Sequence, residues 1–234
     1  MIEVSSLRKT YGSVDALRGI DLKVETGEFL TLFGPNGAGK TTLLKILSTI
    51  IKPTSGKVTI GGMDLADANQ DVRRNIGVIS HKTFLYGDLT ALENLIFYAR
   101  MYELPDPEKR GRELIKEVGL GGREDHHVRT FSRGMEQRLS IARAIIHDPD
   151  IIYLDEPYSG LDQHASLMLA NLLKKLHTPS RTIIMTTHNI SHGLDISDRI
   201  VIQLSGRIVF EDETARHNVE SFEKIYFEKV GAGK

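Results

Sequence analysis

The sequence predicts an α/β fold whose core of strands and helices is interrupted by a helical insert. Short runs rich in β-branched residues, bounded by Gly and Pro turns, fill the first third of the chain and return after about residue 150. Over roughly residues 83 to 147, apolar residues recur instead at three- and four-residue spacing. We therefore expect a single domain over residues 1–234, with a core of about 1–82 and 148–234 and a helical subdomain of about 83–147.

In the first third of the chain, β-branched runs predict strands, and turn residues such as those of Lys52–Gly56 separate them. A helix is expected over Lys40–Ile51, because a glycine-rich loop ends immediately before it and apolar residues follow at helical spacing. The strands that we expect here are Ile2–Val4, Val14–Leu22, Glu28–Phe33, Gly56–Ile60 and Ile76–Ile79.

The insert and the last third follow the same reasoning. Helical spacing in the insert predicts Leu89–Glu103, Asp106–Val118 and Met135–His147. Beyond it, β-branched runs predict the strands Ile151–Leu154, Thr182–Met185, Arg199–Leu204 and Arg207–Phe210. Two further helices are expected at Gln163–Leu176 and Val219–Val230.

The composition is that of a globular protein: of the 234 residues 40% are hydrophobic and 26% charged, with a net charge of −1. Because there is no basic excess, we expect no nucleic-acid partner. The absence of cysteine fits a reducing compartment, and the N-terminus lacks the apolar segment of a signal peptide. No run of 18 or more apolar residues occurs, so any membrane role needs a partner protein.

The segment Gly34–Thr42, GPNGAGKTT, has the composition of a phosphate-binding loop between a strand and a helix. Its glycines let backbone N–H groups turn toward phosphate oxygens, and the helix N-terminus attracts anions. Lys40 can reach the β- and γ-phosphates, and the Thr41 hydroxyl can bind Mg²⁺. The alternative is an ordinary glycine-rich turn. For that to be the case the motif must have arisen by chance, and the probability of a chance match in a chain of this length is about one in a hundred. The nucleotide-binding residues that we expect are Gly34, Pro35, Asn36, Gly37, Ala38, Gly39, Lys40, Thr41 and Thr42.

Two acids end the apolar strand that begins near Asp150. In an open parallel sheet, ligands bind beyond the carboxyl ends of the strands, which places Asp155 and Glu156 beside the phosphate loop. Asp155 is suited to hold Mg²⁺, and Glu156 is suited to polarise the water that attacks the γ-phosphorus. The alternative is a surface turn with two solvated acids.

A second anion site is expected where Ser132, Arg133 and Gly134 open a helix, because a serine hydroxyl and a glycine amide lie at its N-terminus. The simpler interpretation is that Ser132 only caps that helix. Since Gly34–Thr42 already supplies one phosphate cradle, the second predicts contact with a nucleotide held by another subunit. Two chains would then face head to tail and form two composite sites.

His188 follows the strand Thr182–Met185 and is expected at the same sheet edge, where its imidazole could bond the γ-phosphate or the attacking water. A structural role at the strand end is the alternative. The neighbouring histidines His126 and His127 are interpreted as a solvated pair rather than as metal ligands.

The order of these segments, GPNGAGKTT, helical insert, FSRGMEQR, IIYLDEP, SGLD and TTH, resembles the ATP-binding subunits of ABC transporters over essentially the whole chain. The resemblance implies a P-loop NTPase (RecA-like) core, with an N-terminal antiparallel β subdomain and a helical insert subdomain. It also implies that Tyr11 stacks on adenine and that Ser132 and Gly134 contact the partner's ATP. Ser159–Asp162 would link the two monomers, and His188 would act as the switch histidine.

The mechanism implied by the resemblance is that of an ATPase coupled to transport. Two subunits, expected here as a homodimer, close around two Mg-ATP molecules, and hydrolysis reopens them. The cycle moves an integral membrane permease, which would hold the chain on the cytoplasmic face of the cell membrane. The segment His81–Tyr102 is similar to exporter-type ATPases, including those of haem export, so export is the expected direction.

Two residues depart from the family pattern. Arg133 stands where the signature usually has glycine, and we expect a cost of about 1 kcal/mol if its φ is positive. Ser80 and His81 stand where a glutamine usually follows the Ile76–Ile79 strand, so His81 is a candidate for coupling the site to the permease. Two other functions stay open: a non-transport ABC ATPase of DNA repair, translation or Fe–S assembly, and a phosphotransferase acting on a small acceptor.

Overall fold

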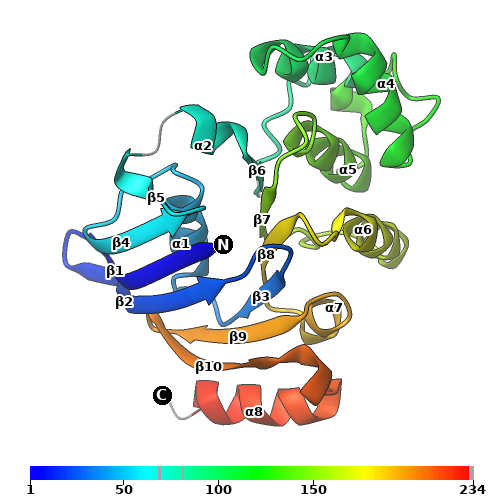
Figure 1. The fold of residues 1–234 in the computed structure, drawn as a ribbon. Helices are drawn as coiled ribbons and strands as arrows, with labels where there is room; N and C mark the ends of the chain where they lie inside the picture. Colours follow the sequence, from blue (N-terminus) through cyan, green and yellow to red (C-terminus); the bar gives the residue numbers. More distant parts are fainter. Residues whose placement is uncertain (68–69, 81, 232–234) are drawn as a thin grey trace.

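The computed structural model describes residues 1–67, 70–80 and 82–231 (Figure 1). It begins with β1 (Ile2–Tyr11), β2 (Val14–Val24), β3 (Phe29–Phe33), α1 (Lys40–Leu47), β4 (Ser55–Ile60), β5 (Met63–Asp64), α2 (Gln70–Arg74) and β6 (Ile76–Ile79). It continues with α3 (Ala91–Met101), α4 (Pro107–Glu117), α5 (Arg133–Ala144), β7 (Ile151–Asp155), α6 (Gln163–Leu176), β8 (Thr182–Thr187), α7 (Ile190–Leu194), β9 (Arg199–Leu204), β10 (Arg207–Glu213) and α8 (Val219–Gly231). No helix within these ranges is both long enough and apolar enough to cross a lipid bilayer.

Within the described residues the strands form two sheets. The larger has the order β10-β9-β3-β8-β7-β6, in which all neighbours are parallel except β9 and β10. The smaller is antiparallel, in the order β2-β1-β4-β5. The predicted fold class, an α/β core with an N-terminal antiparallel β unit and inserted helices, is therefore confirmed.

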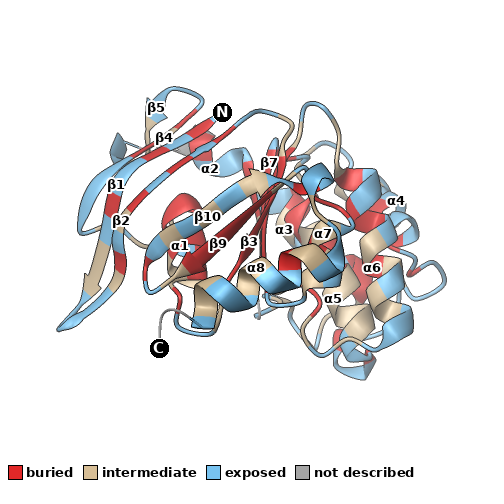
Figure 2. Ribbon diagram, turned by 90° about the horizontal axis from the view of Figure 1, so that it is seen from below, coloured by how far each residue is buried: buried red, intermediate tan, exposed pale blue. Residues whose placement is uncertain are grey.

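The central strands β3, β7 and β8 are buried along their whole length, as expected for parallel strands that are covered on both faces (Figure 2). Alternate residues of β7 belong to different cores. Ile152 and Leu154 pack with the helices α3 to α6, whereas Ile151 and Tyr153 pack with α1 and the antiparallel sheet. The helices α7 and α8 pack against the β9 end of the sheet. The carboxyl ends of β3, β7 and β8 consequently meet at one edge, where the phosphate loop, the two acids Asp155 and Glu156, and His188 lie.

Most predicted elements are present, and the differences have local causes. The strand β1 runs to Tyr11 rather than to Val4, because Ser6 adopts a φ of 48° and shifts the register without ending the pairing. The helix α1 ends at Leu47 rather than Ile51, since the Ser48 hydroxyl donates to the Leu44 carbonyl at 2.7 Å and Thr49 follows with a φ of 61°. The short elements β5, α2 and α7 carry too few residues for a periodic pattern to predict them.

Candidate functional site

The loop between β3 and α1 has a backbone that only glycine fits at its tightest points. Gly34 has a φ of 152°, and a Cβ there would lie 2.2 Å from the backbone oxygen of Gln203. Gly39 has a φ of 103°, and a Cβ there would lie 2.5 Å from the backbone oxygen of Ala16. The loop is therefore pressed against neighbouring backbone, and α1 begins directly after it at Lys40.

A side chain of β9 fixes this loop from outside. The Ala38 carbonyl accepts two hydrogen bonds, from Gln203 Nε2 at 3.0 Å and from the Gly206 backbone N–H at 2.9 Å. Gln203 is fully buried. Both donors lie in or just after β9. The loop is therefore held in place by residues about 165 positions away in the sequence.

Lys40 lies inside the loop. Its Nζ donates to the carbonyls of Gly34 at 2.5 Å and Pro35 at 3.2 Å, and it lies 3.8 Å from Glu156 Oε1. Burial lowers the pKa of the Lys40 amine, and the charges of Glu156 and Asp155 oppose that shift. A buried cation is thus held at the centre of a glycine loop, as the binding of phosphate oxygens requires.

Asp155 is surrounded by hydroxyl groups. One of its oxygens, Oδ1, accepts from Thr41 Oγ1 at 3.0 Å and from Thr186 Oγ1 at 2.7 Å. Asp155 is only 5% exposed. Carboxylate and hydroxyl oxygens are the hard donors that Mg²⁺ prefers, so the groups present fit that ion. Thr186 was not expected from the sequence; it is the residue paired with Asp155 in the neighbouring parallel strand.

Glu156 and His188 form a pair at the same edge. His188 Nδ1 lies 2.9 Å from Glu156 Oε2, and the Glu156 side chain is 12% exposed while that of His188 is 67% exposed. Glu156 has a φ of 51°, a conformation that non-glycine residues rarely adopt. Its backbone N–H, which lies 3.1 Å from both the carbonyl and the hydroxyl of Thr186, stabilises that conformation. The carboxylate is thereby directed toward Lys40 and the imidazole.

Ser132 is the N-cap of α5, and its hydroxyl accepts from the Met135 N–H at 3.3 Å. Within residues 1–67, 70–80 and 82–231 no hydrogen bond joins Ser132 or Gly134 to the phosphate loop. The structure therefore does not bring these two residues to their own chain's loop.

The predicted bounds of α5 were wrong: Met135–His147 was expected, whereas the helix runs from Arg133 to Ala144.

Arg133 is helical and does not have a positive φ, so the condition for the backbone cost considered above is not met. Its guanidinium packs directly on Gly160, where an added Cβ would lie 2.3 Å from Cζ. Arg133 also lines a polar hollow of about 330 Å³ together with Glu136, Glu156 and Ser159. The arginine in place of glycine thus contacts the loop after β7 and borders the glutamate that is expected to activate water.

The remaining expected residues lie in different places. Tyr11 is 48% exposed at the end of β1, where Lys9 Nζ lies 5.1 Å from its ring centroid. His126 and His127 are exposed, and His126 Nε2 lies 3.3 Å from an Arg123 nitrogen. His81 lies outside the described residues. Sequence reasoning overlooked Thr186 and Gln203, and only the regular parallel pairing of β7 with β8 could have indicated Thr186.

Comparison with known proteins identifies the family. The ABC transporter family profile matches residues 17–159. The linearmycin resistance ATP-binding protein LnrL of Bacillus subtilis is 34% identical over 211 residues, which cover 89% of this chain and 68% of that protein. NatA, an ABC transporter ATP-binding protein of the same organism, is 36% identical over 200 residues, or 84% and 81% of the two chains. The daunorubicin/doxorubicin resistance ATP-binding protein DrrA of Streptomyces peucetius is 35% identical over 215 residues, or 91% and 65%.

Solved structures agree with this assignment. A structure of the ATP-binding cassette MJ0796, described as a dimeric post-hydrolysis state bound to ADP and Pi, superimposes with a TM-score of 0.84. It is 32% identical to this chain, and the match covers 92% of this chain and 99% of that one. The chain therefore belongs to the ABC transporter family, as an ATP-binding subunit that hydrolyses ATP.

Proposed function

We propose that two copies of this chain close around two ATP molecules and that the resulting hydrolysis cycle drives a membrane permease. The observation that carries the proposal is the Glu156–His188 pair, joined at 2.9 Å, with Glu156 lying 3.8 Å from the Lys40 amine. An acid, an imidazole and a phosphate-binding cation thus meet at one sheet edge. This arrangement is suited to the attack of water on a terminal phosphate.

In the proposed reaction, Lys40 and the backbone N–H groups of Gly34–Thr42 bind the β- and γ-phosphates. Glu156 accepts a hydrogen bond from the attacking water and draws off its proton as the new P–O bond forms and the bond to ADP breaks. His188 holds the Glu156 carboxylate, and its exposed imidazole would bond the γ-phosphate. The products are ADP and inorganic phosphate. Thr41 and Asp155 would hold Mg²⁺, whose charge offsets that of the phosphates when it is bound.

Of the other site residues, two are assigned to the partner's nucleotide and one to the adenine ring. Ser132 and Gly134 contact the ATP of the facing copy, since the end of α5 is a helix N-terminus that its own phosphate loop does not use. The dimeric structures described for MJ0796 support this assembly. Tyr11, half exposed at the end of β1, stacks on adenine. His81 is kept as a candidate coupling residue.

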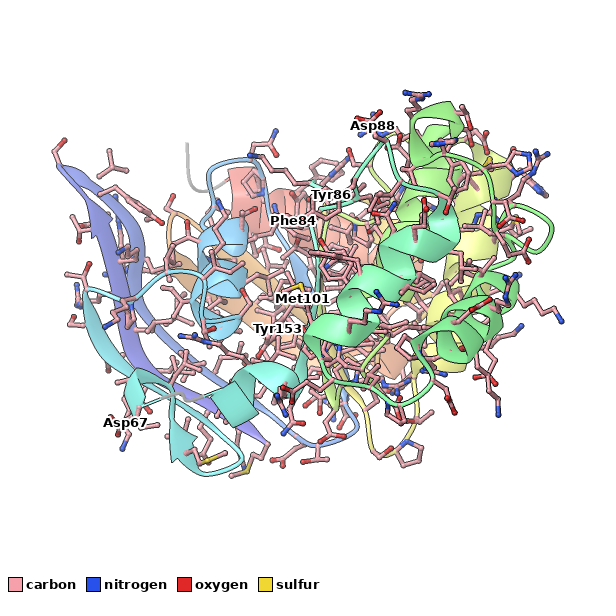
Figure 3. The ribbon with its side chains drawn as sticks, turned by 90° about the horizontal axis from the view of Figure 1, so that it is seen from above. Asp67, Phe84, Tyr86, Asp88, Met101 and Tyr153 are labelled. Carbon is pink, nitrogen blue, oxygen red and sulfur yellow. The ribbon has the colours of Figure 1, made fainter. Side chains whose placement is uncertain are left out.

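The permease would dock on the exposed apolar side chains around α3, a surface that comprises Phe84, Tyr86, Phe97 and Met101. These residues are 50%, 50%, 39% and 62% exposed, respectively. Figure 3 labels three of them, Phe84, Tyr86 and Met101, beside α3. Several large exposed apolar residues near one helix are typical of an interaction surface.

The backbone beneath this surface is held rigidly. The fully buried Asn94 accepts from the Tyr86 N–H at 2.8 Å and donates to the Tyr86 carbonyl at 3.0 Å. The Tyr86 and Phe97 rings meet edge to face at 5.2 Å. The Tyr86 backbone is thus fixed against α3, which lowers the entropic cost of docking at this residue.

We further propose that the chain is one ATPase domain with residues 83–147 as its helical subdomain, located at the cytoplasmic face of the membrane. Export is the proposed direction, because LnrL and DrrA are named as resistance proteins. A relative named for import is similar as well, the spermidine/putrescine import ATP-binding protein PotA of Legionella pneumophila.

The replacement Glu156→Gln tests the proposal. The amide keeps the shape of the side chain but cannot take a proton, so we expect ATP to bind with near-wild-type affinity while hydrolysis falls at least 100-fold. An ATP-dependent dimer should then accumulate and elute earlier on size exclusion. A variant that hydrolyses ATP normally, or that binds it and stays monomeric, would contradict the proposed composite site.

A further inference from the structure

Two rings stack on the segments that follow Glu156 and His188 in the chain. Tyr158 lies in the loop after β7, and His192 lies in the short helix α7. Their ring centroids are 4.2 Å apart with an interplanar angle of 28°. We call this contact the Tyr158–His192 stack.

The contact is made by ring packing and not by hydrogen bonding. Within the described part of the chain, Tyr158 Oη and His192 Nδ1 are both buried and lack a hydrogen-bond partner. A buried polar atom without a partner is destabilising, so the pair is not optimised for stability. What the rings supply is a fixed geometry between two segments of backbone.

Those two segments carry the Glu156–His188 pair. Tyr158 follows Glu156 by two positions, and His192 follows His188 by four. His188 itself is 67% exposed, and its one side-chain hydrogen bond among the described residues goes to Glu156. The helix α7 spans only Ile190–Leu194 and is capped by Asn189, whose Oδ1 accepts from the His192 N–H at 3.0 Å. A helix of this length needs tertiary contacts to stay in place.

The charges near the stack do not make it a titrating switch. Burial lowers the pKa of the His192 imidazole and so favours its neutral form, although the charge of Asp195 opposes that shift. Asp195 is itself paired with Lys174 at 2.7 Å. Burial also raises the pKa of the Tyr158 phenol, so both rings enter the contact uncharged.

We infer that the Tyr158–His192 stack is a positioning device that holds α7 against the loop after β7, and thereby keeps the His188 imidazole on the Glu156 carboxylate. The inference rests on the proposed roles of Glu156 and His188. It assigns no contact with ATP to either ring. Since placement errors of about 1 Å near a reacting group can cost roughly 100-fold in rate, a partial loosening should show as a smaller rate loss.

The test compares His192→Ala with His192→Phe in the full chain. Removing the ring should lower kcat for ATP hydrolysis five- to tenfold while the KM for ATP stays within twofold, because the phosphate loop lies on other elements. The phenylalanine ring restores the stack without a ring nitrogen, so His192→Phe should recover kcat to within twofold of wild type. Tyr158→Phe, which removes only the unpaired hydroxyl, should also leave kcat within twofold.

The chain contains a matched control in a second tyrosine–histidine stack. Tyr102 and His147, which both lie in the helical insert, stack at 3.8 Å with an angle of 8°. His147→Ala removes the same kind of ring contact, together with the 3.2 Å contact of His147 Nε2 with the Ile76 carbonyl, and should lower the melting temperature while leaving kcat and KM within twofold. If it lowers kcat as much as His192→Ala does, a general structural loss explains both and the inference fails.

The remaining outcomes separate this inference from the proposed function. A wild-type kcat in His192→Ala, or no recovery in His192→Phe, overturns the positioning role while Glu156→Gln still abolishes hydrolysis. If Glu156→Gln itself hydrolyses ATP normally, the proposed function has failed, and the inference fails with it. If His192→Ala does not fold, as circular dichroism would show, Tyr158→Leu provides the same test from the other ring.

Discussion

The sheet edge around Asp155 and the surface around Tyr86 differ in the burial of their side chains and in the contacts those side chains make. At the sheet edge, polar groups are buried and bond one another; Asp155, 5% exposed, accepts from both Thr41 and Thr186. Around α3, apolar rings are exposed, and Tyr86 is 50% accessible. The first arrangement is prepared in advance for a small charged ligand. The second gains free energy only when another apolar surface covers it.

The two regions should therefore respond to different measurements, and Lys40→Ala is the strongest test of the first. Removing the cation deletes charge-assisted contacts to two phosphates, which should cost about 3 kcal/mol, or roughly 100-fold in ATP affinity by titration. Lys45→Ala provides the control, since Lys45 is an exposed lysine in the same helix. Near-wild-type ATP affinity in Lys40→Ala would contradict the proposed binding of ATP phosphates by the loop Gly34–Thr42.

A smaller loss is expected from Ser132→Ala. If Ser132 contacts the partner's ATP, hydrolysis should fall about tenfold while ATP binding by the monomer is unchanged. Thr90→Ala is the matched control, because Thr90 caps α3 through the same kind of hydroxyl and has no proposed ligand contact. Both variants should lose about 1 kcal/mol of stability from the missing cap. Equal hydrolysis in the two would reduce Ser132 to a helix cap.

Substitutions in the apolar surface around α3 should weaken binding of the permease. We expect the double variant Tyr86→Ser, Phe97→Ser to recover three- to fivefold less of its permease by copurification from membranes, because covered apolar area is lost. Leu167→Ser is the control, since Leu167 is 61% exposed on α6, outside the proposed surface. Equal losses in the two variants would show that general surface polarity, and not this surface, governs recovery.

The smallest effect concerns acid stability at the junction of the insert and the core. Burial lowers the pKa of His147 from 6.5 to about 4, so between these values the unfolded chain binds more protons than the folded one. The free energy of unfolding should fall as the pH drops through that window and be constant with respect to this group above it. His147→Phe keeps a ring against Tyr102 and should show a smaller difference between urea melts at pH 5 and pH 7.5. An unchanged difference would assign the acid sensitivity to other groups.

The sequence by itself determined the parts of the protein that depend on neighbouring residues. The spacing of glycines and Lys40 in Gly34–Thr42 predicted a loop between a strand and a helix, and the structure has β3 and α1 there. Apolar runs predicted the buried strands, and the strands Ile76–Ile79 and Arg199–Leu204 have the predicted bounds. The helix Gln163–Leu176, predicted from apolar residues at helical spacing, also has the predicted bounds. These features follow from backbone conformation and local periodicity, which short stretches of sequence encode.

The sequence placed Asp155, Glu156 and His188 beside the phosphate loop, but other contacts between distant side chains were decided only by the tertiary structure. Thr186 reaches Asp155 because β8 pairs with β7, and Gln203 reaches the Ala38 carbonyl from 165 positions away. The Tyr158–His192 stack likewise joins the loop after β7 to the helix α7, which follows β8. Nothing in the local sequence around either partner specifies such contacts, because they depend on strand order and on the packing of α7 against the sheet. They arise only when the whole chain has folded.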